Sequence, residues 1–272
     1  MQRGTARQSE EVRLSVATFL ETLQSEAFIR RLLSLLRDFA PEYLPDSFQG
    51  FFVDQRYVGF EGPVTSLDAD TIPLLVRALE TPQLGDVKLT RGDPPTTTVV
   101  LPTRVRGSIQ HYYVHLSIRR DLLKSSNGQE RFLRVARQLF LTCEGFFGEF
   151  GTFRHMKTEP VEGAPGTYNL VVTNLAHGLP PPDWGFLLGP EYVSLIGADR
   201  IKRAPCEVVR EFDNGRFMLL LAKDFETLEA DENLLEERRH RLVEHFGPEY
   251  FSYVRNRQSK VVLPRFARGK TE

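Results

Sequence analysis

Residues 213–215, Asp-Asn-Gly, form a strong β-hairpin signal. Asparagine and glycine tolerate the positive backbone φ angles that a tight turn between antiparallel strands requires. The turn separates two apolar segments, Cys206–Phe212 and Arg216–Leu221. We expect these two segments to pair as antiparallel strands. The C-terminal part of the chain is therefore predicted to contain antiparallel strands.

The rest of the chain alternates between helix-like and strand-like segments. Apolar residues at helical spacing predict helices over Val12–Leu23, Ala27–Phe39, Thr71–Glu80, Gln129–Cys143 and from Asp231 or Asn233 through Phe246. Alternating or aromatic segments predict strands over Phe48–Val53, Arg56–Phe60, Val87–Leu89, Thr96–Leu101, His111–Ile118, Phe146–Phe153 (a glycine-punctuated turn into a strand), Tyr168–Thr173 and the strand-like Val261–Leu263.

These elements predict an α+β fold with antiparallel-rich sheets and helices packed on one face. We expect a flexible arm over residues 1–11, an N-terminal α+β half over 12–157 and a C-terminal α+β half over 168–272. The boundary is placed near 157–167, which includes a Pro/Gly-rich loop. One continuous domain is the alternative, because 272 residues also suit a single large domain.

A Pro-Glu-Tyr pattern occurs three times, at Pro41–Tyr43, Pro190–Tyr192 and Pro248–Tyr250. Proline suits the first position of a helix, and glutamate in the first turn complements the helix dipole. We therefore interpret the pattern as a reused helix start. Duplication of a helix-plus-strand unit, which would give two similar halves, is the alternative.

The charges of the chain nearly cancel, since 35 basic and 36 acidic residues give a net charge of −1. Nothing in this balance attracts nucleic acid or an anionic membrane, although the basic tail Arg255–Arg268 leaves nucleic-acid binding as a weaker alternative. Met1–Glu11 lacks the apolar region of a signal peptide. No apolar run approaches the roughly 20 residues of a membrane span. We expect a cytoplasmic protein without membrane contact.

The sequence contains few signs of catalysis. Cys143 and Cys206 are predicted to be free, buried thiols, with a disulfide or a nucleophile as the alternative. Motifs for phosphate loops, dinucleotide binding, nucleophile elbows and zinc ribbons are absent from the sequence. We therefore predict no catalytic residue, metal or cofactor. The alternative is a hydrolase or nucleotide-processing enzyme with a site outside the known motifs, for which the candidates are His115, Glu144, Glu149 and His155.

The single tryptophan, Trp184, follows three prolines and Asp183 and precedes Gly185. Such a residue is either a core anchor or an exposed interface residue, and both interpretations remain open at this point. The segment Asp183–Gly189 and the short helix that ends at Gly197 resemble the x-Trp-x-x-Phe-Leu-Gly-like segment of the bacterial type VI immunity proteins, a family of polymorphic-toxin immunity proteins. The resemblance is firmest over residues 178–225 and looser over 110–175.

This resemblance implies a non-enzymatic protein that binds and neutralises a cognate toxin. The toxin would be delivered by a contact-dependent or type VI secretion system and encoded by an adjacent gene. The family supplies no catalytic residue, and its partner contacts cannot be placed by motif. The oligomeric state is not indicated by the sequence.

Partner-binding residues are predicted from residue type. Trp184 and Tyr192 are expected to anchor the partner, because buried aromatic residues dominate many interfaces. Acidic residues crowd the start of the last predicted helix, where they form either a solvated helix start or an acidic face for a basic partner. The predicted partner-binding residues are Asp183, Trp184, Glu191, Tyr192, Asp231 and Glu232.

Overall fold

The computed structural model shows an α+β fold with antiparallel strand pairing, as the sequence predicts. It describes residues 11–52, 58–63, 71–81, 84–102, 111–124, 127–152, 158–160, 168–170, 175, 178–180, 182–213, 215–251 and 262–266. The chain forms two compact units. The N-terminal unit contains Met1–Arg106 and Gln110–Gly145, and the C-terminal unit contains Gly107–Ile109 and Phe146–Glu272.

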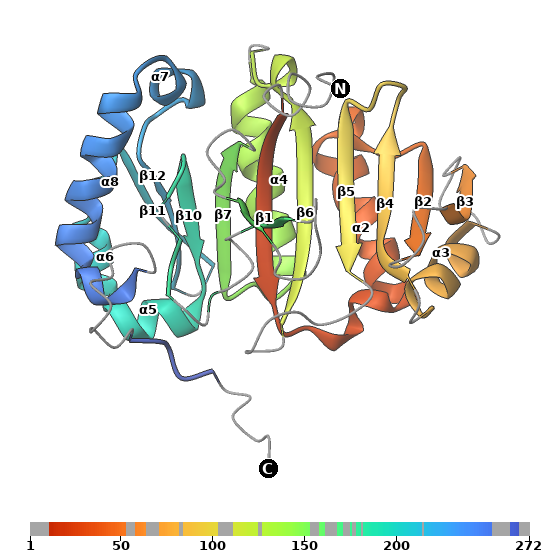
Figure 1. Ribbon diagram of the computed structural model, residues 1–272, viewed down its shortest axis with the longest axis horizontal. Helices are drawn as coiled ribbons and strands as arrows, with labels where there is room; N and C mark the ends of the chain where they lie inside the picture. The colour runs from red at the N-terminus through yellow and green to blue at the C-terminus, as the bar shows by residue number, and fades with distance from the viewer. Residues whose placement is uncertain are drawn as a thin grey trace. The chain divides into compact units, whose positions relative to one another are not determined.

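The sheet of the N-terminal unit has the strand order β1-β6-β5-β4-β2-β3, and every neighbouring pair is antiparallel (Figure 1). Its strands are β1 (Glu11–Thr18), β2 (Ser47–Phe52), β3 (Val58–Pro63), β4 (Leu84–Arg91), β5 (Thr97–Pro102) and β6 (Tyr112–Arg119). One row of buried apolar side chains crosses five of these strands, from Leu14 through Leu116, Val99 and Leu89 to Phe48. This row is the centre of the apolar face of the sheet.

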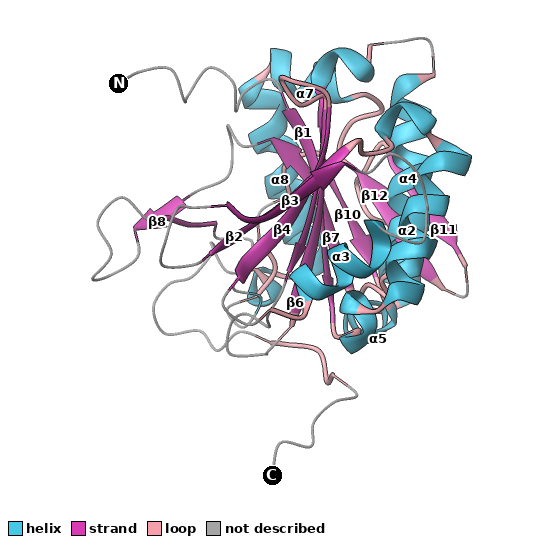
Figure 2. Cartoon of the chain, turned by 90° about the vertical axis from the view of Figure 1, so that its right-hand side faces the viewer, coloured by secondary structure: helices cyan, strands magenta, loops and turns pink. Residues whose placement is uncertain are grey.

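Three helices of this unit, α2 (Glu26–Phe39), α3 (Thr71–Leu79) and α4 (Gly128–Thr142), lie on the same side of the strands (Figure 2). The helix α2 packs against both α3 and α4, while α3 contacts β4 and α4 contacts β1. Helix α2 begins where the Ser25 hydroxyl accepts a hydrogen bond from the Phe28 backbone N–H, at 3.2 Å. The predictions of helices over Ala27–Phe39, Thr71–Glu80 and Gln129–Cys143 are confirmed to within two residues.

The helix predicted over Val12–Leu23 is wrong. Residues Glu11–Thr18 form the strand β1, which pairs with β6, and only the short 3-10 turn η1 (Glu21–Gln24) follows. Val12 and Val16 are four residues apart and fit a helical period as well as a strand period, so spacing could not decide. The β-branched side chains favour the pleated surface, and both faces of the strand are buried.

In the C-terminal unit, neighbouring strands are also antiparallel, and their order is β11-β12-β10-β7. These strands are β7 (Phe147–Thr152), β10 (Gly185–Leu188), β11 (Val208–Phe212) and β12 (Arg216–Leu220). The predicted hairpin is confirmed, and its turn contains positive φ angles at Asp213 and Gly215. A separate small ladder joins β8 (Thr158–Pro160) to β9 (Tyr168–Leu170).

The α-helices in the described part of the C-terminal unit are α5 (Pro190–Ile196), α6 (Ala198–Lys202), α7 (Phe225–Ala230) and α8 (Glu232–Phe246). Helix α5 packs against β10 and β12, α6 against β11 and α8, and α7 against α8. Helix α8 ends at Gly247, whose φ is 106°, as expected for a glycine that terminates a helix. None of the helices among the described residues is long and apolar enough to cross a membrane.

The three Pro-Glu-Tyr segments each begin a helical turn, which confirms their interpretation as helix starts. They form the 3-10 turn η2 (Pro41–Tyr43), the first turn of α5 and the 3-10 turn η6 (Pro248–Tyr250). The first and last follow the long helices α2 and α8 directly. In all three, proline occupies the first helical position, where a missing N–H costs nothing.

Other sequence predictions fall wholly or partly outside the described residues. This applies to the arm before residue 11, to most of the boundary near 157–167, and to His155. Of the strand-like Val261–Leu263, residues 262 and 263 are described and form no strand.

Gly185 is the residue that lets β10 approach β12. A Cβ atom added there would lie 2.1 Å from the Leu219 carbonyl oxygen, far inside van der Waals contact. The variant Gly185→Ala should therefore push the two strands apart, with a loss of about 3 kcal/mol or more in the free energy of unfolding. Urea denaturation followed by circular dichroism measures this loss.

Gly215→Ala is the matched control. The Gly215 φ is +82°, but an added Cβ would have no atom within 4 Å. We expect only the cost of a strained backbone, about 1–2 kcal/mol. Equal losses in the two variants would show that close strand packing is not the reason for Gly185.

Candidate functional site

Trp184 lies in the core of the C-terminal unit, which settles the question that the sequence left open. Its side chain is 0% exposed, and its indole Nε1–H donates to the Ala222 carbonyl at 3.0 Å. Its ring contacts Phe150 and Phe225 edge to face, with centroids 5.7 and 5.6 Å apart. Its backbone also forms hydrogen bonds with two segments far away in the sequence. The Trp184 N–H donates to the Phe150 carbonyl, and the Trp184 carbonyl accepts from the Leu221 N–H.

Asp183 is a buried carboxylate that joins strand to helix. One of its oxygens accepts the Thr152 backbone N–H at 2.8 Å, and the other lies 3.1 Å from the Arg239 guanidinium of α8. Arg239 also donates to the Pro182 carbonyl and to the Glu236 carboxylate, each at 2.5 Å. Both side chains of the central ion pair are nearly inaccessible, so each charge depends on the other.

The sequence analysis missed Arg239, although a signal was present. Arg239 lies on the same helical stripe as the buried residues Leu235, Leu242, Val243 and Phe246 of α8. A cation in the middle of an apolar stripe requires a buried acceptor. Asp183, also flagged from the sequence, supplies it.

Tyr192 and Glu191 belong to the packing of α5. The Tyr192 side chain is 1% exposed, and its ring contacts Phe146 and Phe147. Burial raises the pKa of its hydroxyl, and the neighbouring Glu191 charge raises it further. Glu191 is half-buried. Tyr192 therefore packs in the core of the C-terminal unit.

The exposed members of the predicted set lie at the start of α8. Asp231 caps the helix by accepting from the backbone N–H groups of Asn233 and Leu234, at 3.0 and 3.1 Å. Glu232, Glu236 and Glu237 are also exposed, and we call these four side chains the α8 acidic start. Glu236 and Glu237 pair with Arg239 and Arg241, whereas Asp231 and Glu232 make no ion pair with another described residue. The N-terminus of α8 offsets part of this negative charge.

The residues proposed for the enzymatic alternative lie on different elements. Glu144 is exposed on the turn after α4 and belongs to the N-terminal unit, whereas Glu149 is buried in β7 of the C-terminal unit. His155 lies outside the described residues. No group of three or more side chains suited to a metal ion is found in the described part of the chain.

His115 is part of a polar cluster on β1 and β6. Arg13 Nε donates to His115 Nδ1 at 3.1 Å, and the same ring nitrogen lies 3.0 Å from the Ser15 hydroxyl. The His115 ring stacks on Tyr113, and Tyr113 in turn contacts His111 edge to face. Arg13 and Ser15 alternate with Val12 and Leu14, so they occupy the opposite face of β1 from the apolar row.

The two cysteines are free, as predicted. Cys143 is fully buried, and burial raises the pKa of its thiol. Cys206 is partly exposed, and burial raises its pKa to about 12 even though Arg238 acts in the opposite direction. A nucleophilic cysteine requires a lowered pKa, so both thiols behave as small apolar side chains.

Comparison with known proteins identifies a shared fold. Among solved structures, the chain is similar to the Pseudomonas aeruginosa T6SS protein PA0821, with a TM-score of 0.52 and 14% sequence identity. The match covers 85% of this chain and 76% of that chain. No model of a known protein family matches the chain, and a search of curated proteins finds no match.

Removal of the Asp183 carboxylate should strongly destabilise the protein. Asp183→Ala leaves the Arg239 guanidinium without its buried carboxylate partner, which costs about 3–5 kcal/mol. The control is Glu236→Gln, because the Glu236 side chain is 64% exposed and should contribute less than about 1 kcal/mol. Equal unfolding midpoints for the two variants in urea would contradict this assignment.

His111 should make the stability of the protein depend on pH. Burial lowers its pKa to about 4, whereas the unfolded value is about 6.5, so the unfolded state binds more protons between these values. The free energy of unfolding should therefore fall by up to about 3 kcal/mol as the pH drops from about 6.5 to 4.

The His111→Phe variant isolates this effect, because phenylalanine keeps a ring beside Phe19 and Tyr113. Its stability should vary less with pH than that of the parent protein. His240→Gln, at an exposed position on α8, should keep the parent slope. Parallel curves for His111→Phe and the parent would exclude His111 as the source.

Proposed function

We propose that this protein is an immunity protein of a type VI secretion system, which binds a cognate toxin and blocks its activity. The observation that carries the proposal is the structural similarity to a Pseudomonas T6SS protein over 85% of this chain. The Asp183–Gly189 segment supports it separately, through its resemblance to type VI immunity proteins. An inhibitor of this kind acts by occupying a surface of its target.

The α8 acidic start is the surface we assign to the partner. Asp231 and Glu232 are exposed and carry charge that no described ion pair compensates. Uncompensated surface charge speeds the encounter with a partner of opposite sign. We therefore expect the partner to present a basic surface at this contact.

Trp184 and Tyr192 are buried side chains of the C-terminal unit. We therefore expect these two residues to affect partner binding through the fold of this unit. Trp184 follows Asp183, which holds Arg239 and hence α8 in place. Loss of the tryptophan should reduce binding through loss of the fold, which circular dichroism beside a pull-down assay detects.

A rescue experiment tests the function. The product of the adjacent gene is expressed in a bacterial host with and without this protein, and survivors are counted. We expect toxicity that disappears only when this protein is present, together with co-purification of a stoichiometric complex. A harmless neighbour, or toxicity that this protein does not relieve, would contradict the proposal.

A charge variant tests the surface once the toxin is available. Asp231→Asn combined with Glu232→Gln removes two charges but keeps an asparagine cap on α8. We expect the association rate to fall on the order of threefold to tenfold, with a weaker dependence on salt. The control is Glu80→Gln, at an exposed position of the N-terminal unit. Equal association rates for the two variants would show that the toxin does not bind at the α8 acidic start.

A further inference from the structure

Strand β11 lies at the edge of the strands in the C-terminal unit. It pairs with β12 on one side, and no described strand pairs with its other side (Figure 1). Among the described residues, the backbone of Val208–Glu211 forms no hydrogen bond beyond the ladder with β12. Alternate residues of a strand direct their N–H and C=O groups to opposite edges. The outer edge of β11 therefore presents unpaired donors and acceptors, which is the arrangement that a further strand requires.

Two charged side chains lie on this edge strand. Glu211 forms an ion pair with Lys202 of α6 at 2.9 Å, so its side chain points to the face of β11 that α6 covers. The neighbouring Arg210 is exposed and occupies the opposite face, because successive side chains of a strand alternate. Its guanidinium makes no ion pair or hydrogen bond with any residue in the described part of the chain. Arg210 therefore offers a charge that an incoming acidic side chain can compensate.

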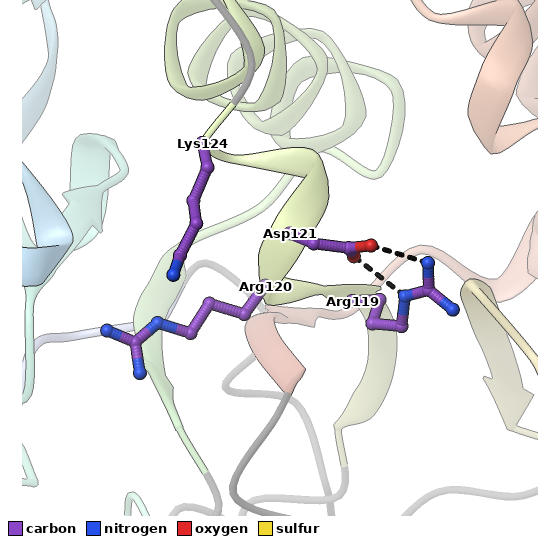
Figure 3. Close-up of a pocket in the computed structure, with 4 residues that line it drawn as sticks. All are labelled: Arg119, Arg120, Asp121 and Lys124. Atoms are coloured by element: carbon purple, nitrogen blue, oxygen red, sulfur yellow. Dashed lines mark hydrogen bonds and ion pairs between the residues drawn. The ribbon is translucent and has the colours of Figure 1, made fainter.

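Arg119, the partly exposed arginine that ends β6, differs from Arg210 on both counts. Its Nε donates to the Asp121 carboxylate at 2.7 Å (Figure 3). Strand β6 also has a neighbour on each side, β1 and β5, so its backbone is paired at both edges. An unpaired arginine beside an unpaired backbone edge is thus a feature of β11 and not of β6.

The order of charges along β11 disfavours a second copy of this chain as the partner. Residues directly opposite each other in an antiparallel ladder share one hydrogen-bonding orientation, so a two-fold pair of β11 strands has to centre on a residue that faces its own copy. Centred on Arg210, the pair opposes two arginines, and centred on Glu211, it opposes two glutamates. One residue before Arg210, the pair opposes Glu211 and Glu207, and one residue after Glu211, it opposes Glu211 and Asp213. Like charges directly opposite each other are destabilising, which favours a different chain as the partner.

A pocket of about 320 Å³ lies where β11 begins. It is lined by Pro205, Cys206, Glu207, Leu221, Arg238 and Arg241. Arg238 ties the pocket to α8, since its Nη2 lies 2.9 Å from the Glu207 carboxylate. Arg238 is less than two helical turns from Glu232, the first residue of α8. One partner can therefore contact both the start of β11 and the α8 acidic start, because an interface of standard size covers roughly 20–30 residues on each side.

We propose that the outer edge of β11 pairs with an extended segment of the toxin, which adds a strand to the sheet and carries an acidic side chain opposite Arg210. Backbone hydrogen bonds give strand addition its affinity, and pockets along the edge give it specificity. Val208 and Phe212 share the face of Arg210, so we expect apolar side chains on either side of the acidic residue. This inference rests on the proposed immunity function and specifies how the complex forms.

Hydrogen exchange of the full-length protein, alone and in complex with the product of the adjacent gene, tests the strand addition. We expect alternate amides of Val208–Phe212 to exchange quickly in the free protein. In the complex they should exchange about tenfold more slowly or less, because the added strand protects them. The amides of β5, an interior strand of the N-terminal unit, should exchange at the same rate in both samples.

A charge reversal at Arg210 tests the acidic side chain of the toxin. Arg210→Glu changes an exposed position, so the variant should fold, which a thermal melt checks. We expect the Kd for the toxin to rise about tenfold or more, since the acidic residue then faces a like charge. The matched control is Arg31→Glu, at an exposed position of α2 in the N-terminal unit, which should leave the Kd unchanged.

The outcomes separate this inference from the function on which it rests. A complex that forms without slower exchange in β11, or with equal Kd values for Arg210→Glu and Arg31→Glu, would overturn the strand addition and leave the immunity function standing. Failure of the two proteins to form any complex would overturn both. Slower exchange in β11 that increases with the concentration of this protein alone would assign the edge to a second copy and would also overturn the proposal.

Discussion

The buried carboxylate of Asp183 is the interaction on which the C-terminal unit depends. It accepts a hydrogen bond from the Thr152 backbone N–H of β7 and forms an ion pair with Arg239 of α8. One side chain therefore joins the sheet to the last long helix. A buried charge is tolerated only when hydrogen bonds and an opposite charge replace the water that it loses. Gly151 makes this possible, because an added Cβ would lie 2.6 Å from the carboxylate oxygen.

The segment that resembles immunity proteins is thereby explained as a packing motif. Asp183 fixes α8, Trp184 fills the space between the sheet and α7, and Gly185 allows β10 to lie close to β12. The residues that make the segment recognisable are therefore buried. Under the proposed function, we expect specificity for a toxin to come from exposed side chains around this framework, such as those at the start of α8.

A net charge of −1 conceals a local acidic surface. This surface is the α8 acidic start, which lies on the C-terminal unit. Global composition cannot reveal such patches, because it sums over charges that neutralise each other elsewhere. The exposed Asp231 and Glu232 side chains were predictable because acidic residues cluster at a helix start.

The sequence by itself determined the elements that local rules control. Helix α2 and the turn at residues 213–215 follow from apolar spacing and from positive φ angles, which neighbouring residues decide. Only the tertiary structure decided that Val12–Thr18 is a strand, since its apolar spacing fits both periods until β6 pairs with it. The burial of Trp184 and the role of Arg239 were likewise decided there, because both depend on contacts with segments far away in the sequence.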